Sequence, residues 1–345
     1  VSRLPSGLTQ SRFPSRIHQI IPPFSLWWVA MVHDYWLWRD DTAFVQAQLP
    51  AIRSVLESFR ALLDDNSLLT PPNGWNFMDW VREPVAWDAG IPPQASVEPS
   101  APLNLQLALV LQMKAQLEEW AGEALLAERD RQTAGRIMDA VRKTFWHTPR
   151  GILADDRDHR YFSQHSQCLA ILSGLFSREE CDSMVKALVE ANDLAPASIY
   201  FSHYLLEAFR VTGQDVAFFR RLQQWYQLKE MGLCTTIEAP EPSRSDCHAW
   251  GAHPLFHCFA SIIGIRPKAP GFRQVAIAPM PGQLRQLRAK LPHPSGSIEV
   301  ELHLPEPQIL EGEITLPPTI AGELTWKGKT QQLNSGRNTL RLAAF

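Results

Sequence analysis

Two stretches of the sequence combine carboxylates with aromatic side chains, and both could bind a sugar. The first is residues 75–80 (WNFMDW), in which two indoles flank Asp79. An indole is a large, rigid surface on which the C–H face of a sugar ring can stack. A carboxylate such as Asp79 can accept charge-assisted hydrogen bonds from two neighbouring hydroxyls. The alternative is a packed loop, with Trp80 in the core and Asp79 capping the segment that follows, and the sequence leaves both interpretations open.

The second stretch is residues 234–250 (CTTIEAPEPSRSDCHAW), which carries three carboxylates, an arginine and a histidine. Glycoside hydrolysis needs two carboxyl groups flanking the scissile bond, one protonated and one ionised. Glu238 or Glu241 could supply one of them. Asp246 is better placed as the N-cap of a final helix, because the residues after it are expected to be helical.

The remaining candidates for chemistry give weaker signals. His253 and His257 have the i, i+4 spacing of zinc ligands, but the glutamate of an H-E-x-x-H motif is absent, so no metal is predicted. His248 is expected in the core or at a sugar site. Residues 163–165 (SQH) could line a funnel or pack as polar helix residues. No G-x-S-x-G, P-loop or G-x-G-x-x-G occurs, so neither a hydrolase triad nor a cofactor is predicted.

The elements that must position these residues are mainly helical. Apolar spacing from about residue 24 to 264 predicts eight or nine helices with boundary errors of about 2–4 residues. We expect a ring of helical hairpins, an (α/α) toroid, because the long tryptophan-rich loop at 70–100 suits a functional funnel better than a plain right-angled bundle. The predicted helices cover 24–38, 42–59, 100–117, 137–145, 177–189, a segment ending before Gly213, one capped by Asp215, and 248–263 with a kink at Pro254.

After Gly264 the pattern changes to that of β-strands. Residues 297–304 alternate strictly between polar and apolar side chains, which is the period of a half-buried strand. Prolines and glycines separate further short strands. We therefore expect a toroid catalytic domain at 1–264 and a small antiparallel β-sandwich at 265–345, with the other strands near 272–277, 284–291, 309–316, 324–326 and 339–342.

Composition narrows the class of partner. The 345 residues carry a net charge of −3 without a basic stripe, which argues against nucleic acid. There is no run of 18 apolar residues, which argues against a membrane span. Five scattered cysteines without a CxxC pair favour reduced thiols and a cytoplasmic location, although any signal peptide would lie upstream of Val1. A homodimer is left open.

Several of these segments together resemble a known family. Thr235 and Thr236, a nearby glutamate and the run PEPSRSDCHAWGAHP at 240–254 are similar to the bacterial α-L-rhamnosidases of glycoside hydrolase family 78. So are 7–15 (GLTQSRFPS), 75–80 and 271–279 (GFRQVAIAP). The resemblance covers essentially the whole chain in the right order. It implies an inverting hydrolysis of terminal α-L-rhamnosides inside a ring of six helical hairpins, with a rhamnose-containing carbohydrate as the substrate.

The resemblance also assigns roles. It places the general base on Glu238, with Glu241 as the substitute because the spacing after the threonine pair is one residue shorter than the family pattern. It places sugar-binding roles on Asp79, Trp80 and His248, and we expect Trp75 and Trp250 to bind the substrate as well. The family's general acid lies upstream of the segment at 7–15 and has no counterpart here. We therefore expect a fragment that keeps the base, lacks the acid and is inactive alone.

Two alternatives remain. The chain could be another toroid glycosidase or a lyase with a different sugar specificity, which a sugar-preference measurement would separate. It could also be a non-catalytic sugar-binding remnant, which differs from the first interpretation only by the missing acid.

Overall fold

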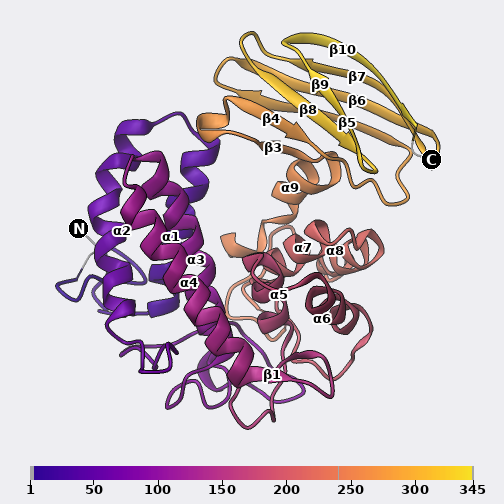
Figure 1. Ribbon diagram of the computed structural model, residues 1–345. Helices are drawn as coiled ribbons and strands as arrows, with labels where there is room; N and C mark the ends of the chain where they lie inside the picture. Colours follow the sequence, from indigo (N-terminus) through magenta and orange to yellow (C-terminus); the bar gives the residue numbers. More distant parts are fainter. Residues whose placement is uncertain (1–3, 240, 344–345) are drawn as a thin grey trace. The chain divides into compact units, whose positions relative to one another are not determined.

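The computed structural model describes residues 4–239 and 241–343 (Figure 1). These residues form two compact units, and each is described by itself. The first unit comprises Val1–Asp34, Ala43–Ala208 and Ile237–Ser245; the second comprises Tyr35–Thr42, Phe209–Thr236 and Asp246–Phe345. None of the helices in the described part of the chain is long and apolar enough to span a membrane.

The first unit is built from helices joined by long loops. Four of them begin within two residues of the predicted positions, because their start signals are local. The helix predicted at 137–145 is wrong in its start, which lies at Ala124, and the helix Gln164–Ser173 was not predicted. Ser100 is the N-cap of the third helix and a proline lies in its first turn, as expected. The helices are α1 (Pro22–Trp38), α2 (Thr42–Arg60), α3 (Ala101–Trp120), α4 (Ala124–Phe145), α5 (Gln164–Ser173), α6 (Arg178–Glu190) and α7 (Ser202–Val211), with a short β1–β2 hairpin (Trp146–His147 and Ile152–Leu153) after α4.

Helix α3 is buried on nearly all sides, whereas its neighbours α2 and α4 are amphipathic. It packs against α4 and α5, and even its polar residues Asn104, Gln106, Lys114 and Glu118 are buried. A helix that is buried all round belongs inside a helical assembly, while a helix with one apolar stripe covers its outside. This alternation along the chain is the pattern expected of helical hairpins.

The start of α6 is fixed by a capping box. The hydroxyl of Ser177 accepts a hydrogen bond from the backbone N–H of Glu180, and the Glu180 carboxylate accepts one from the backbone N–H of Ser177. Two backbone N–H groups that the helix itself cannot pair are therefore satisfied.

Replacing Ser177 by alanine should lower the free energy of unfolding by about 1 kcal/mol, because the Ala methyl group cannot accept the Glu180 N–H. Urea denaturation monitored by circular dichroism would measure the change. Ser183→Ala, inside the same helix, is the matched control and should be neutral or slightly stabilising because alanine has the higher helix propensity. Equal effects of the two substitutions would contradict the capping role.

The second unit begins its helical part with α8 (Asp215–Glu230), and here two predicted caps are wrong. Gln214 is the N-cap of α8; Asp215 is the first helical residue and its carboxylate accepts the N–H of Val216. Asp246 does not cap a final helix at all. Its carbonyl instead accepts a hydrogen bond from the hydroxyl of Thr235, within the turn that precedes the helix.

The predicted continuous helix at 248–263 is also wrong. The structure has a 3₁₀ turn (Ala249–Gly251), then α9 (Pro254–His257), which continues as a π-helix (Cys258–Ile263). Pro254 is the first residue of α9 rather than a kink inside a helix, because proline lacks the N–H that an interior position must donate.

The β-part of the second unit contains two four-stranded sheets, in the order β10-β7-β6-β5 and β3-β4-β8-β9. Among the described strands of these sheets, five of the six pairs are antiparallel as expected, but β4 and β8 pair parallel, so the second sheet is mixed. Two short strands, β3 and β9, were not predicted. The strands are β3 (Ile265–Pro267), β4 (Gln274–Ile277), β5 (Gln286–His293), β6 (Gly296–Glu306), β7 (Ile309–Leu316), β8 (Ala321–Trp326), β9 (Lys329–Leu333) and β10 (Gly336–Ala343).

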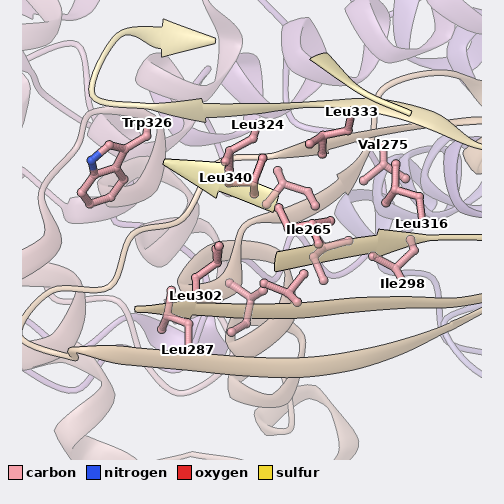
Figure 2. Close-up of a cluster of buried hydrophobic side chains, with 14 of the residues drawn as sticks. Ile265, Val275, Leu287, Ile298, Leu302, Leu316, Leu324, Trp326, Leu333 and Leu340 are labelled. Carbon is pink, nitrogen blue, oxygen red and sulfur yellow. The ribbon is translucent and has the colours of Figure 1, made fainter. Parts of the chain in front are cut away.

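The alternating residues of β6 explain the packing of this part. Ile298, Val300 and Leu302 are buried, and the residues between them are not. Figure 2 shows the side chains of strands from both sheets meeting in one apolar cluster. Gly312 on β7 is required where β7 pairs with β6, because a Cβ there would lie 2.1 Å from the carbonyl oxygen of Glu301.

Candidate functional site

The loop between α2 and α3 holds the WNFMDW segment in a fixed shape. The backbone N–H of Trp75 donates to the carbonyl of Ile20 (2.9 Å), and its indole N–H donates to the carbonyl of Ala89 (2.7 Å). Gly90 accepts the N–H of Met78 and has φ +74°. A Cβ at Gly90 would lie 2.5 Å from the ring of Phe77, so this position requires glycine.

Asp79 is completely buried, and its carboxylate binds protein donors. One oxygen accepts from Nε2 of His165 (2.8 Å) and from the backbone N–H of Ser198 (2.7 Å). The other accepts from the backbone N–H of Trp80 (2.9 Å) and from the hydroxyl of Ser198. The three donors from His165 and Ser198 tie the loop to the N-terminal end of α5 and to the segment before α7. These contacts therefore favour the interpretation of Asp79 as part of a packed loop over its interpretation as a ligand for sugar hydroxyls.

Trp80 follows this anchor and lies half-exposed. Its ring contacts Phe77 edge-on (centroids 4.9 Å apart) and lies 6.0 Å from the ring of Trp75. Its indole N–H donates to Oε1 of Glu238 at 3.2 Å. Residues separated by 158 positions are therefore brought together, since the buried Asp79 fixes the backbone from which the indole projects.

Glu238 is 5 % exposed and is held by two donors. Besides the Trp80 indole, the guanidinium of Arg244 forms an ion pair with the same Oε1, and it lies 4.8 Å from the centre of the Trp80 ring. The backbone N–H of Glu238 donates to the carbonyl of Ser245 (2.9 Å), so the loop closes on itself. The result is a nearly buried carboxylate held by the indole N–H of Trp80 and by a cation that lies over the face of the same indole.

The two loops of this site also contact each other directly. Arg82, two residues after Trp80, donates to the carbonyl of Pro242 at 2.8 Å. Glu241, the predicted substitute for Glu238, is exposed, and its carboxylate accepts the N–H of Ser243 (2.7 Å) within its own turn. Of the two glutamates, Glu238 is the one in contact with the tryptophan cluster.

His248 and Trp250 belong to the second unit. The N–H of His248 donates to the carbonyl of Thr236 (2.7 Å), the Thr236 hydroxyl donates back to the carbonyl of His248 (2.8 Å), and the rings of His248 and Trp250 lie 4.4 Å apart. Nearby, Nδ1 of His257 is hydrogen-bonded to the hydroxyl of Ser261 (3.0 Å). The sugar-binding roles of His248 and Trp250 remain predictions.

Sequence reasoning noticed His165 without assigning its partner, and it missed Ser198. No local pattern marks Ser198, since it follows an irregular segment before α7. Arg244 was recognised as part of the charged run, but nothing in the run indicated that it would pair with Glu238 rather than with Glu241. These contacts arise from loop packing, which the order of residues alone does not reveal.

Comparisons with known proteins give a consistent result. Residues 2–262 match the model of the bacterial alpha-L-rhamnosidase 6 hairpin glycosidase domain, and residues 264–341 match that of the bacterial alpha-L-rhamnosidase C-terminal domain. A comparison with curated proteins gives no match.

Three solved structures illustrate the similarity of the fold. A family 78 rhamnosidase from Bacillus sp. GL1 is 24% identical, with a TM-score of 0.82 over 92% of this chain and 34% of its own. The α-L-rhamnosidase of Aspergillus terreus is 17% identical (TM-score 0.80; 98% of this chain, 41% of its own). That of Streptomyces avermitilis, complexed with L-rhamnose, is 18% identical (TM-score 0.74; 97% and 34%).

This chain therefore spans about a third of the length of the Bacillus enzyme. The two family models together cover nearly all of it, in the order in which the helical part and the β-part occur. The helical part has the six-hairpin glycosidase fold, and the β-part follows it. The chain belongs to the bacterial α-L-rhamnosidase family.

Proposed function

We propose that this chain supplies the general base and part of the sugar pocket for inverting hydrolysis of terminal α-L-rhamnosides. The observation that carries the proposal is the contact of Glu238 with the indole of Trp80 and the guanidinium of Arg244. It places a carboxylate, one of the two carboxyl groups that glycoside hydrolysis requires, beside a tryptophan. The family membership and the rhamnose complex of the Streptomyces relative support rhamnose as the sugar.

The chemistry assigns one proton transfer to Glu238. A water molecule attacks the anomeric carbon while the bond from that carbon to the leaving oxygen breaks. The Glu238 carboxylate takes the proton of the attacking water, and a second carboxylic acid protonates the leaving oxygen. That acid is not assigned to a residue of this chain. The guanidinium of Arg244 holds Oε1 of Glu238 in an ion pair.

We assign a different role to each of the other predicted site residues. Trp80, with Trp75 next to it, forms the stacking surface for the sugar ring. Because protein donors already bind its carboxylate, Asp79 positions Trp80 rather than binding hydroxyls itself. We also propose that the helical catalytic domain comprises 1–264 and the β-domain 265–345, and that His248 and Trp250 bind the sugar.

A thermal-shift titration with L-rhamnose tests the proposal, with L-fucose, D-glucose and D-mannose as controls. A ligand present at 100 times its Kd adds about 2.7 kcal/mol of stability, so a stabilisation by L-rhamnose should be measurable. Stabilisation by another of these sugars and not by L-rhamnose would instead favour a different glycosidase specificity.

Replacing Trp80 by alanine should remove the stacking surface and weaken L-rhamnose binding by about tenfold, because a well-placed aromatic contact contributes about 0.5–1.5 kcal/mol beyond the area it buries. Isothermal titration calorimetry would measure the change. Trp146→Ala is the matched control: Trp146 is also half-buried, but its ring stacks on Phe176 instead. Unchanged affinity of the Trp80 variant would reject the stacking role.

A further inference from the structure

The first unit contains a second concave site, which shares no side chain with the Trp80–Glu238 cluster. It is a pocket of about 180 Å³ formed by the loop before α3, the segment between α4 and α5, and the segment after α6. At about 30 Å³ per water molecule, its volume equals that of roughly six waters. The pocket is therefore large enough for a small ligand and smaller than the sites that take drug-sized molecules. Its lining includes Val85, Trp87, Arg150, Asp155, Arg160 and Tyr161.

Asp155 is the feature that points to a ligand. It is completely buried, and its Oδ1 accepts hydrogen bonds from the hydroxyls of Ser163 (2.8 Å) and Ser166 (2.5 Å). Its Oδ2 is buried as well and has no hydrogen-bond partner among the described residues. Burial, reinforced by the neighbouring Asp156, raises the pKa of Asp155 to about 7, against the hydrogen bonds from Ser166 and Ser163. A buried polar atom without a partner is costly, so a ligand that hydrogen-bonds to Oδ2 would be favoured.

The charges around the pocket favour a neutral ligand. Arg150 is paired with Asp193 (2.9 Å), and Arg160 is paired with Asp158 (2.8 Å). Neither guanidinium therefore supplies an uncompensated positive charge that would select a phosphate or a carboxylate. Both retain further N–H donors, because a guanidinium has five.

The walls add aromatic surface. Trp87 and Tyr161 both line the pocket, and the ring of Trp87 packs 4.6 Å from the ring of His165, the residue that binds Asp79. Aromatic walls, a carboxyl group and guanidinium N–H donors together suit a molecule with an apolar face and several hydroxyls. Sugars have this combination.

We propose that this pocket binds one neutral, hydroxylated ring of monosaccharide size, with a hydroxyl donating to Oδ2 of Asp155. The site is separate from the Trp80–Glu238 cluster and does not depend on the function proposed for that cluster. The loop at 79–90 carries residues of both sites, since Trp80 contacts Glu238 and Trp87 lines the pocket.

Filling the pocket tests the proposal without disturbing the buried carboxylate. Val85 is 47 % exposed and lines the pocket, so Val85→Trp should block it and leave the fold intact. Val97→Trp is the matched control, because Val97 lies in the same loop, is 73 % exposed and does not line the pocket. Calorimetric titrations with L-rhamnose, L-fucose, D-glucose and D-mannose would be made on the whole chain.

At least one of the four sugars should bind with an affinity that Val85→Trp weakens by about tenfold or more, and that Val97→Trp and Trp80→Ala leave unchanged. Asp155→Asn should weaken the same binding, because the amide has an NH₂ group in place of one carboxylate oxygen. An NH₂ group at the position of Oδ2 cannot accept a hydrogen bond from the sugar hydroxyl. If no sugar shows a binding event that depends on Val85 and Asp155, the proposal is overturned. Loss of rhamnose stabilisation in Trp80→Ala alone concerns the proposed catalytic site and not this pocket.

Discussion

Glu238→Gln should abolish hydrolysis of an aryl α-L-rhamnoside by the protein that carries this chain and leave rhamnose binding nearly intact. The amide has the shape of the carboxylate and an oxygen that can still accept from the Trp80 indole, but it cannot take a proton from the attacking water. A positioned general base contributes about 10²–10⁴-fold, so kcat should fall by that factor. Release of a chromogenic leaving group measures turnover, and calorimetry measures rhamnose affinity.

Two further variants sharpen this test. Glu241→Gln should keep near-normal turnover, because the Glu241 carboxylate is exposed and serves only its own turn. Glu238→Ala should regain part of its turnover when azide is added, since azide attacks without needing a base. If Glu241→Gln lost turnover and Glu238→Gln kept it, the general base would be Glu241. The shorter spacing after the threonine pair would then have moved the base to a different position from the one the family pattern assigns.

Local signals in the sequence were sufficient to predict most helices and the longest strand. Ser177 and Glu180 form the capping box that their spacing indicated, and β6 has the buried alternation of Ile298, Val300 and Leu302. In both cases the deciding interactions lie within a few residues of each other. The series of predicted helices and the family resemblance together indicated the six-hairpin fold class.

Elements without such signals were missed or misjudged. β9 (KTQQL) is mostly polar and pairs only with β8, so its sequence has no apolar alternation. The segment at 248–263 looked continuously helical because its apolar spacing is helical. Pro254 inside this segment is instead the first residue of α9, and Ala249–Gly251 before it form a 3₁₀ turn.

The candidate site was predictable as a set of residues but not as a geometry. Spacing and resemblance singled out Trp80 and Glu238, yet their contact depends on two loops 158 residues apart meeting in the folded chain. Asp79 shows the limit most clearly. Its type and place suggested a ligand for hydroxyls, whereas burial against His165 and Ser198 makes it an anchor for the loop. The catalytic role of Glu238 itself remains a prediction.

Replacing Lys114 by methionine should lower the free energy of unfolding by about 3–5 kcal/mol, the cost of breaking a buried ion pair by removing one partner. Lys114 is 1 % exposed and pairs with two completely buried carboxylates, Glu118 at 2.9 Å and Asp130. Burial raises the pKa of Asp130 despite these cations. For Glu118, hydrogen bonds from Arg53 and Lys114 outweigh the effect of burial and lower its pKa. The variant would leave both carboxylates with one cation fewer in a medium that disfavours charge.

The experiment compares the unchanged protein with Lys114→Met, Glu118→Met, the double variant and Lys186→Met by urea denaturation. Lys186→Met, at an exposed lysine on α6, should be neutral within about 0.5 kcal/mol. Lys114→Met with Glu118→Met should cost less than the sum of the two single changes, because Asp130 keeps its ion pair with Arg60, and Arg53 keeps Glu123 at 3.6 Å. An equally small change in the free energy of unfolding for Lys114→Met and Lys186→Met would contradict this prediction. It would mean that water screens the charges of this cluster. In that case α3 could not be the buried inner helix that the alternation of α2, α3 and α4 indicates.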